Sequence, residues 1–139
     1  MTRSQAREHI FKLLYEMQFK QEEYDVEEVV LTYLENFPEE NVSDNDKTFI
    51  LSEVKGVQQT KESLDEEIAG AVKGWSLSRI SKVDLAILRL AVYEIRCVPE
   101  IPSSVSINEA VELAKKYSQS AARSFINGIL GSIAPREEK

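Results

Sequence analysis

Apolar residues recur at helical spacing along almost the whole chain, and no segment keeps the strict alternation of a strand. The spacing predicts helices over about 4–19, 26–37, 43–68, 83–95, 106–117 and 120–133, with a short turn at 76–80. Pro38, Pro99 and Pro135 stand where a helix is expected to end. The fold class is therefore all-α, with about seven helical elements in one compact domain over residues 1–139.

Polar residues mark two of the expected helix starts. Ser43 is followed three residues later by Asp46, and Ser106 is followed by Glu109 in the pattern of a capping box. Gly56 is not expected to interrupt the segment 43–68, which reads as one long helix. The helix that begins near Val83 is apolar on more than one face, so we expect it to be the most buried element.

Composition favours a cytoplasmic, non-enzymatic protein. The chain has 42% hydrophobic residues, but it has neither a secretory leader nor an apolar run near the ~20 residues that cross a bilayer, so we expect no membrane contact. The single cysteine, Cys97, and the single histidine, His9, cannot form a metal cage. Because a glycine-rich phosphate loop is also missing, we expect no metal, no cofactor and no catalytic residues.

Charge is distributed unevenly along the chain. The formal net charge is −7, but residues 21–70 hold 15 acidic and 3 basic residues, whereas the remainder holds 9 acidic and 14 basic residues. Electrostatic interactions are screened over about 8 Å at physiological salt. A basic face can therefore bind phosphate groups while an acidic face lies elsewhere on the same protein.

A first candidate RNA-binding group lies on the N-terminal helix. On a helical wheel Arg7, Phe11 and Gln18 share one flank, and Arg3 lies near the helix start. Arginine binds phosphate, an aromatic ring stacks on a base, and an amide reads a base edge, so this set suits single-stranded RNA. The alternative is that Phe11 belongs to the core and Arg7 is an ordinary surface cation.

Two further groups combine basic and aromatic residues. Lys115, Lys116, Tyr117 and Arg123 belong to a stretch without an acidic residue between Glu112 and Glu137, which suits a phosphate platform. The alternative is a helix C-terminus that simply favours cations. The third group surrounds the only tryptophan and consists of Lys73, Trp75, Arg79 and Lys82. Trp75 either stacks on a base or lies in the core.

Four stretches together resemble the NusB family. They are Ala6-Arg7-Glu8 with Leu14-Tyr15, the segment 75–94 that begins Trp-Ser-Leu-Ser-Arg-Ile, the segment 102–115 with Ser-Ile-Asn-Glu-Ala, and Phe-Ile-Asn-Gly-Ile-Leu at 125–130. Their order and gaps fit the family over essentially the whole chain. The resemblance implies seven helices in two packed sub-bundles.

The resemblance also implies a function. Members bind the boxA segment of ribosomal RNA leader transcripts as heterodimers with a small-subunit ribosomal protein, NusE. The pair joins other Nus factors on RNA polymerase and lets it read through terminators. Some relatives self-associate, so a homodimer stays open.

The resemblance assigns roles to individual residues. Lys73 and Trp75 match a basic and an aromatic position near RNA, and Arg123, Ser124 and Phe125 match the RNA-contacting start of the last helix. Relatives often carry lysine where this chain has Ser124, and a longer arginine run where this chain keeps only Arg3 and Arg7.

Two residues match the surface that meets the ribosomal protein. They are Asp84, in the apolar fifth helix, and Tyr15, in the first helix.

Two other function classes remain open at this point. One is a helical protein–protein interaction module that uses the acidic stretch as its interface. The other is a stand-alone relative of the RNA-binding domain of an rRNA methyltransferase. We expect no catalytic domain, because the chain ends at Lys139.

Overall fold

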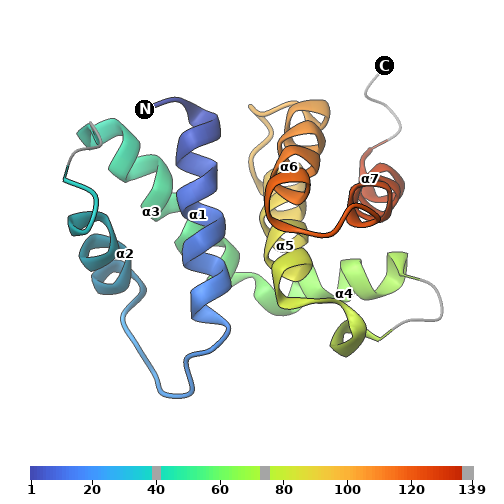
Figure 1. The fold of residues 1–139 in the computed structure, drawn as a ribbon, viewed down its shortest axis with the longest axis horizontal. Coiled ribbons are helices and arrows are strands. Elements are labelled where there is room, and N and C mark those ends of the chain that lie inside the picture. Colours follow the sequence, from blue (N-terminus) through green and yellow to red (C-terminus); the bar gives the residue numbers. More distant parts are fainter. Residues whose placement is uncertain (39–41, 73–75, 136–139) are drawn as a thin grey trace. The chain divides into compact units, whose positions relative to one another are not determined.

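The structure is a computed structural model that describes residues 1–38, 42–72 and 76–135 (Figure 1). The regular elements within these ranges are all helical: α1 (Arg3–Met17), α2 (Val26–Glu35), α3 (Asp44–Gln59), α4 (Lys61–Ala71), the short 3-10 helix η1 (Leu77–Arg79), α5 (Lys82–Cys97), α6 (Ser103–Tyr117) and α7 (Ala122–Ile133). The predicted all-α class with seven helices is confirmed. The helices divide between two compact units, Met1–Gln59 and Thr60–Lys139.

The first unit is a bundle of three helices in which α3 packs against both α1 and α2. The apolar stripe of α1 is buried as its spacing predicts, and its members are Ala6, Ile10, Leu13, Leu14 and Met17. Val30 and Leu34 from α2 and Ile50, Val54 and Val57 from α3 complete this core. Removing these side chains from water supplies the main driving force for the fold of the unit.

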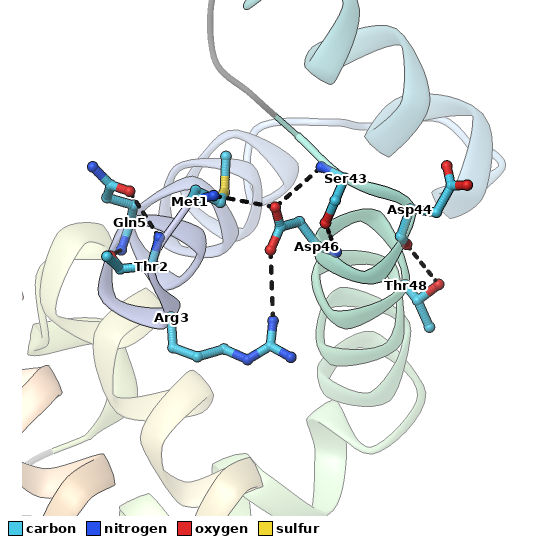
Figure 2. A network of polar contacts seen from close by, with 8 residues as sticks. All are labelled: Met1, Thr2, Arg3, Gln5, Ser43, Asp44, Asp46 and Thr48. Carbon is cyan, nitrogen blue, oxygen red and sulfur yellow. Dashed lines mark hydrogen bonds and ion pairs between the residues drawn. The ribbon is translucent and has the colours of Figure 1, made fainter.

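Polar side chains define the helix starts of the first unit. The backbone N–H of Asp46 donates to Ser43 Oγ, and the N–H of Ser43 donates to Asp46 Oδ2, each at 3.1 Å (Figure 2). This reciprocal pair satisfies backbone N–H groups at the N-terminus of α3 and confirms the helix start expected at Ser43. Thr2 and Gln5 form the same motif at the start of α1.

The second unit is built around α5. This helix packs against α4, α6 and α7, and α5 and α6 lie side by side (Figure 1). Eight of its side chains are buried, from Leu85 to Glu94. The fifth helix is strongly buried, but the expectation that it is the most buried element is wrong, because eight of the 15 residues of α1 are buried and eight of the 16 residues of α5.

The charged residues of α5 bind neighbouring segments of the second unit. Two are arginines paired with α4: Arg89 donates to Asp65 at 2.8 and 2.9 Å, and Arg96 donates to Glu67 at 2.7 Å. Glu94, which is 1% exposed, accepts a hydrogen bond of 2.8 Å from the hydroxyl of Ser106 in α6. A buried charge is costly unless it is hydrogen-bonded. The bonds of Arg89 and Glu94 therefore compensate for the hydration that these side chains lose inside the second unit.

The predicted long helix over 43–68 is wrong, because the chain forms α3 and α4 instead. Thr60 separates them with φ −110° and ψ 13°, outside the helical region. A threonine favours such a position, since its branched side chain loses freedom inside a helix. The physical reason for the break is tertiary: α3 packs on α1 and α2, whereas Leu64 and Ile68 of α4 are buried in the second unit.

The predicted start of a helix at Ser106 is also wrong. Helix α6 begins at Ser103, directly after Pro102, so Ser106 lies inside its first turn. Proline has no N–H to bond and is well tolerated at a helix start. The hydroxyl of Ser106 therefore does not cap the helix, and it binds Glu94 instead.

Replacement of Ser106 by alanine should destabilise the protein. The substitution removes a hydrogen bond from a buried carboxylate, which costs about 1–3 kcal/mol. Urea unfolding at neutral pH measures the loss. Ser104→Ala is the control, because Ser104 is exposed in the same turn of α6 and should change the unfolding free energy by less than about 0.5 kcal/mol. Equal effects of the two substitutions would contradict a structural role for the Ser106–Glu94 bond.

Candidate nucleic-acid interface

A cationic corner joins α6 to α7 in the second unit. It comprises the exposed residues Lys115, Lys116, Arg123 and Ser124 and the half-buried rings of Tyr117 and Phe125. Lys116 Nζ lies 5.6 Å from the centroid of the Tyr117 ring. The end of α6 favours positive charge, because its carbonyl groups carry the negative pole of the helix. The cationic corner therefore offers both positive charge and aromatic surface.

Ser118 fixes this cationic corner to the start of α5. Its hydroxyl donates to Asp84 Oδ1 at 2.6 Å, and the N–H of Asp84 in turn donates to Ser81 Oγ at 3.1 Å. A hydrogen bond to a carboxylate is among the stronger ones in proteins. The short link between α6 and α7 is thereby held in one position.

The start of α7 adds backbone donors to the same corner. Its N-cap residue, Ala121, has no side-chain oxygen, and no side chain caps this helix end. The positive pole of a helix and its first N–H groups form a natural site for an anion. Arg123 and Ser124, both exposed, lie in this first turn.

In the first unit, Arg3 is the exposed cation of α1. Its guanidinium lies 3.9 Å from Asp46 Oδ1 (Figure 2). The same group lies 4.0 Å from the centroid of the Phe49 ring. The side chain keeps 48% of its exposure. It is therefore oriented by an aromatic ring and a carboxylate while still open to a ligand.

Asp46 lies at the centre of this network. Its Oδ2 accepts from the N–H of Ser43 and from the amino group of Met1, the latter at 3.3 Å. The bond from the Ser43 N–H is the main reason that the pKa of Asp46 is lowered, while partial burial opposes it and the Ser43 hydroxyl and Met1 lower it further. The carboxylate is therefore ionised at neutral pH.

Two of the residues expected to touch RNA from α1 are buried. Arg7 is 5% exposed, with its guanidinium 5.8 Å from the centroid of Phe49, and Phe11 is 3% exposed. Phe11 lies in the core, as the alternative interpretation held, because its flank borders the apolar stripe of α1. Neither side chain presents a surface to a ligand in this conformation. Gln18, the C-cap residue of α1, is half-buried.

The remaining predicted residues do not belong to the cationic corner, and two of them fall outside the described ranges. Lys73 and Trp75 fall in the segment 73–75, which the structure does not describe, while Arg79 and Lys82 are exposed beside it. Tyr15 is half-buried, and its ring lies 6.4 Å from that of Phe11 and 5.2 Å from that of Phe19.

Comparison with known proteins places the chain in a family. The model of the NusB family matches residues 4–135. The chain belongs to the NusB family. The transcription antitermination protein NusB of Acetivibrio thermocellus is 48% identical over 133 residues, which cover 96% of this chain and 88% of that protein.

Solved structures give the same result. A crystal form of NusB from T. maritima superposes with a TM-score of 0.85 at 34% identity and covers 99% of this chain and 96% of that one. A crystal structure of the antitermination factors NusB and NusE in complex with double-stranded RNA superposes with a TM-score of 0.77 at 25% identity, covering 96% and 97%. The relatives are thus named as transcription factors, not as enzymes.

Sequence reasoning missed the side chains that orient the cations in this NusB-family chain. The sequence indicates Asp46 only as part of a helix start and gives no signal for Phe49. The partner of Ser118, Asp84, is 34 residues away. A pairing at that separation leaves no local pattern in the sequence. In the described part of the chain no helix is long and apolar enough to span a membrane, and no cluster of metal ligands is present.

The lowered pKa of Asp46 predicts a contribution to acid stability. Because the folded-state pKa lies below the unfolded one, the ionised carboxylate stabilises the fold above about pH 4, and this contribution is lost as the pH falls through the folded-state value. Asp46→Asn should therefore be less stable than the parent at pH 7. The difference in unfolding temperature between the two proteins should become smaller toward pH 3, as measured by thermal unfolding. Asp44→Asn, an exposed carboxylate at the same helix end, is the control. A difference in unfolding temperature that does not change with pH would contradict the stabilising role of the ionised Asp46 carboxylate.

Proposed function

We propose that this chain is a transcription antitermination factor that binds the boxA segment of ribosomal RNA leader transcripts. It acts together with the small-subunit ribosomal protein NusE, and the pair joins other Nus factors on RNA polymerase to carry it past terminators. The observation that carries the proposal is the cationic corner between α6 and α7 in a chain of the NusB family. A related NusB with NusE and RNA in one crystal supports it.

Charge supports the second unit as the main RNA surface. The first unit holds 13 acidic and 6 basic residues, whereas the second holds 11 of each. The basic residues near the corner also have no acidic sequence neighbour from residue 113 to residue 136. Phosphate is therefore repelled by the first unit as a whole and attracted at the cationic corner.

The proposed roles follow from position. Lys116 and Arg123 bind phosphates, and Phe125 offers its half-buried ring to a base. Ser124 and the first-turn N–H groups of α7 beyond Ala122, whose N–H donates to the Gln119 carbonyl, add hydrogen bonds. Arg3 supplies a further phosphate contact from α1. Lys73 and Trp75 keep the role that the family resemblance implies. Arg7 and Phe11 are buried, so they are not among the proposed RNA contacts.

Asp84 and Tyr15 are the proposed contacts to the ribosomal protein. Asp84 is half-buried and its Oδ1 accepts the Ser118 hydroxyl, so a cation of the partner would meet Oδ2. The same residue would then touch the partner and hold the cationic corner in place. Two ligands that bind connected surfaces raise each other's affinity by the same factor.

Substitution of Arg123 by glutamine should weaken RNA binding and reduce its salt dependence. Loss of one phosphate contact to a single strand lowers the slope of log K against log salt by about 0.7. Fluorescence anisotropy with a labelled boxA RNA across a salt series measures both quantities. Lys61→Gln is the control, because it removes one exposed cation from α4 in the same unit. Equal loss of affinity in the two variants would contradict the role of Arg123. A parent that retains no RNA at low or moderate salt would instead favour the protein-binding module.

The proposed link to NusE predicts cooperative binding. Addition of NusE should raise boxA affinity by about 5- to 150-fold, which is the usual range of coupling between two sites. Asp84→Asn should reduce this gain and leave RNA affinity without NusE unchanged, because asparagine retains an oxygen that accepts from Ser118. Equal affinities with and without NusE would contradict the cooperative mechanism.

A further inference from the structure

A groove in the first unit is not used by the proposed RNA function. It lies between the end of α1 and one face of α2 and has a volume of about 550 Å³. Its lining residues are Glu16, Lys20, Glu28, Val29, Thr32, Tyr33, Asn36 and Phe37. The groove combines aromatic rings with carboxylates and so differs from an apolar cleft.

The groove has the chemistry that recognises a cationic side chain. The rings of Tyr33 and Phe37 lie 5.0 Å apart at an interplanar angle of 44°, and Glu16 and Glu28 bring carboxylates to the same space. A guanidinium or ammonium group is attracted by the face of an aromatic ring and by a carboxylate. The length of such a side chain also allows its methylene groups to lie against Val29.

The aromatic wall of the groove is held from behind by His9. Its Nδ1 lies 2.8 Å from the hydroxyl oxygen of Tyr33, and its ring lies 4.9 Å from that of Phe37, edge to face. His9 itself is 5% exposed. A wall whose side chains are already fixed loses little conformational entropy when a ligand binds.

The charge around the groove selects the partner. Residues 16–37 include seven acidic residues and one base, Lys20, so this segment repels phosphate. Phe19, the sequence neighbour of the lining residue Lys20, is an apolar ring that is 54% exposed. A basic peptide with an apolar residue near its cation is complementary to these features.

We propose that the groove between α1 and α2 binds a basic segment of a protein partner, with an arginine or lysine side chain against Tyr33 and Phe37. Glu16 and Glu28 pair with its charge, and Phe19 contacts an apolar neighbour in the same segment. The site lies wholly within the first unit and does not depend on RNA binding at the cationic corner.

Peptide binding to the full chain tests the proposal. The probe is a fluorescein-labelled peptide in which arginine alternates with leucine, compared with a peptide that has glutamine at each arginine position. Anisotropy at about 0.15 M salt should show binding of the arginine peptide alone. Glu28→Gln should raise its Kd by about fivefold, since a partly exposed ion pair contributes about 1 kcal/mol. Thr32→Arg should raise it by more than tenfold, because a cation then occupies the groove.

Each substitution has a matched control on α4. Glu62 is exposed in the first turn of its helix, as Glu28 is, and Ser63 is exposed as Thr32 is. Glu62→Gln and Ser63→Arg should leave the Kd within about twofold, and RNA affinity should not change in Glu28→Gln. Equal binding of both peptides, or equal weakening by Glu28→Gln and Glu62→Gln, would overturn the proposal. Failure of RNA binding in all proteins would instead count against the boxA function and leave the peptide result intact.

Discussion

The burial of α5 is the constraint on which the second unit depends. A helix that packs against α4, α6 and α7 leaves Arg89 and Glu94 little access to water, so these charges need partners on neighbouring segments. Glu94 binds α6, Arg89 and Arg96 bind α4, and Asp84 binds the link that follows α6. Through the last of these bonds, the same constraint that completes the core also positions the proposed RNA-binding surface.

Much of this fold could be predicted from the sequence because helical periodicity is local. The stripe of α1 and the all-round apolar character of α5 identify both helices and their burial without tertiary information. The break at Thr60 could not be predicted, because it depends on which unit each half packs against. The helix start predicted at Ser106 was wrong for a related reason. A serine followed three residues later by a glutamate occurs inside helices as well as at their starts.

The candidate site could be predicted where it consists of exposed charge. Lys116 and Arg123 are recognisable because acidic residues are missing around them, a feature that the sequence shows directly. A helical wheel does not distinguish the border of an apolar stripe from the surface, which is why Phe11 and Arg7 were assigned to the ligand and are found buried. The ion pair of Arg3 with Asp46 and the bond of Ser118 to Asp84 join distant segments and required the structure.

The position of Arg3 has a consequence for selectivity. Its guanidinium rests on the Phe49 ring and faces the carboxylate of Asp46. An incoming anion must therefore replace this carboxylate next to the guanidinium, and not only water. The ring contact can persist through the exchange, which spares the side chain a reorientation. If Arg3 binds RNA as proposed, a phosphate group would have to take the place of the Asp46 carboxylate, so an isolated small anion would gain little from the exchange.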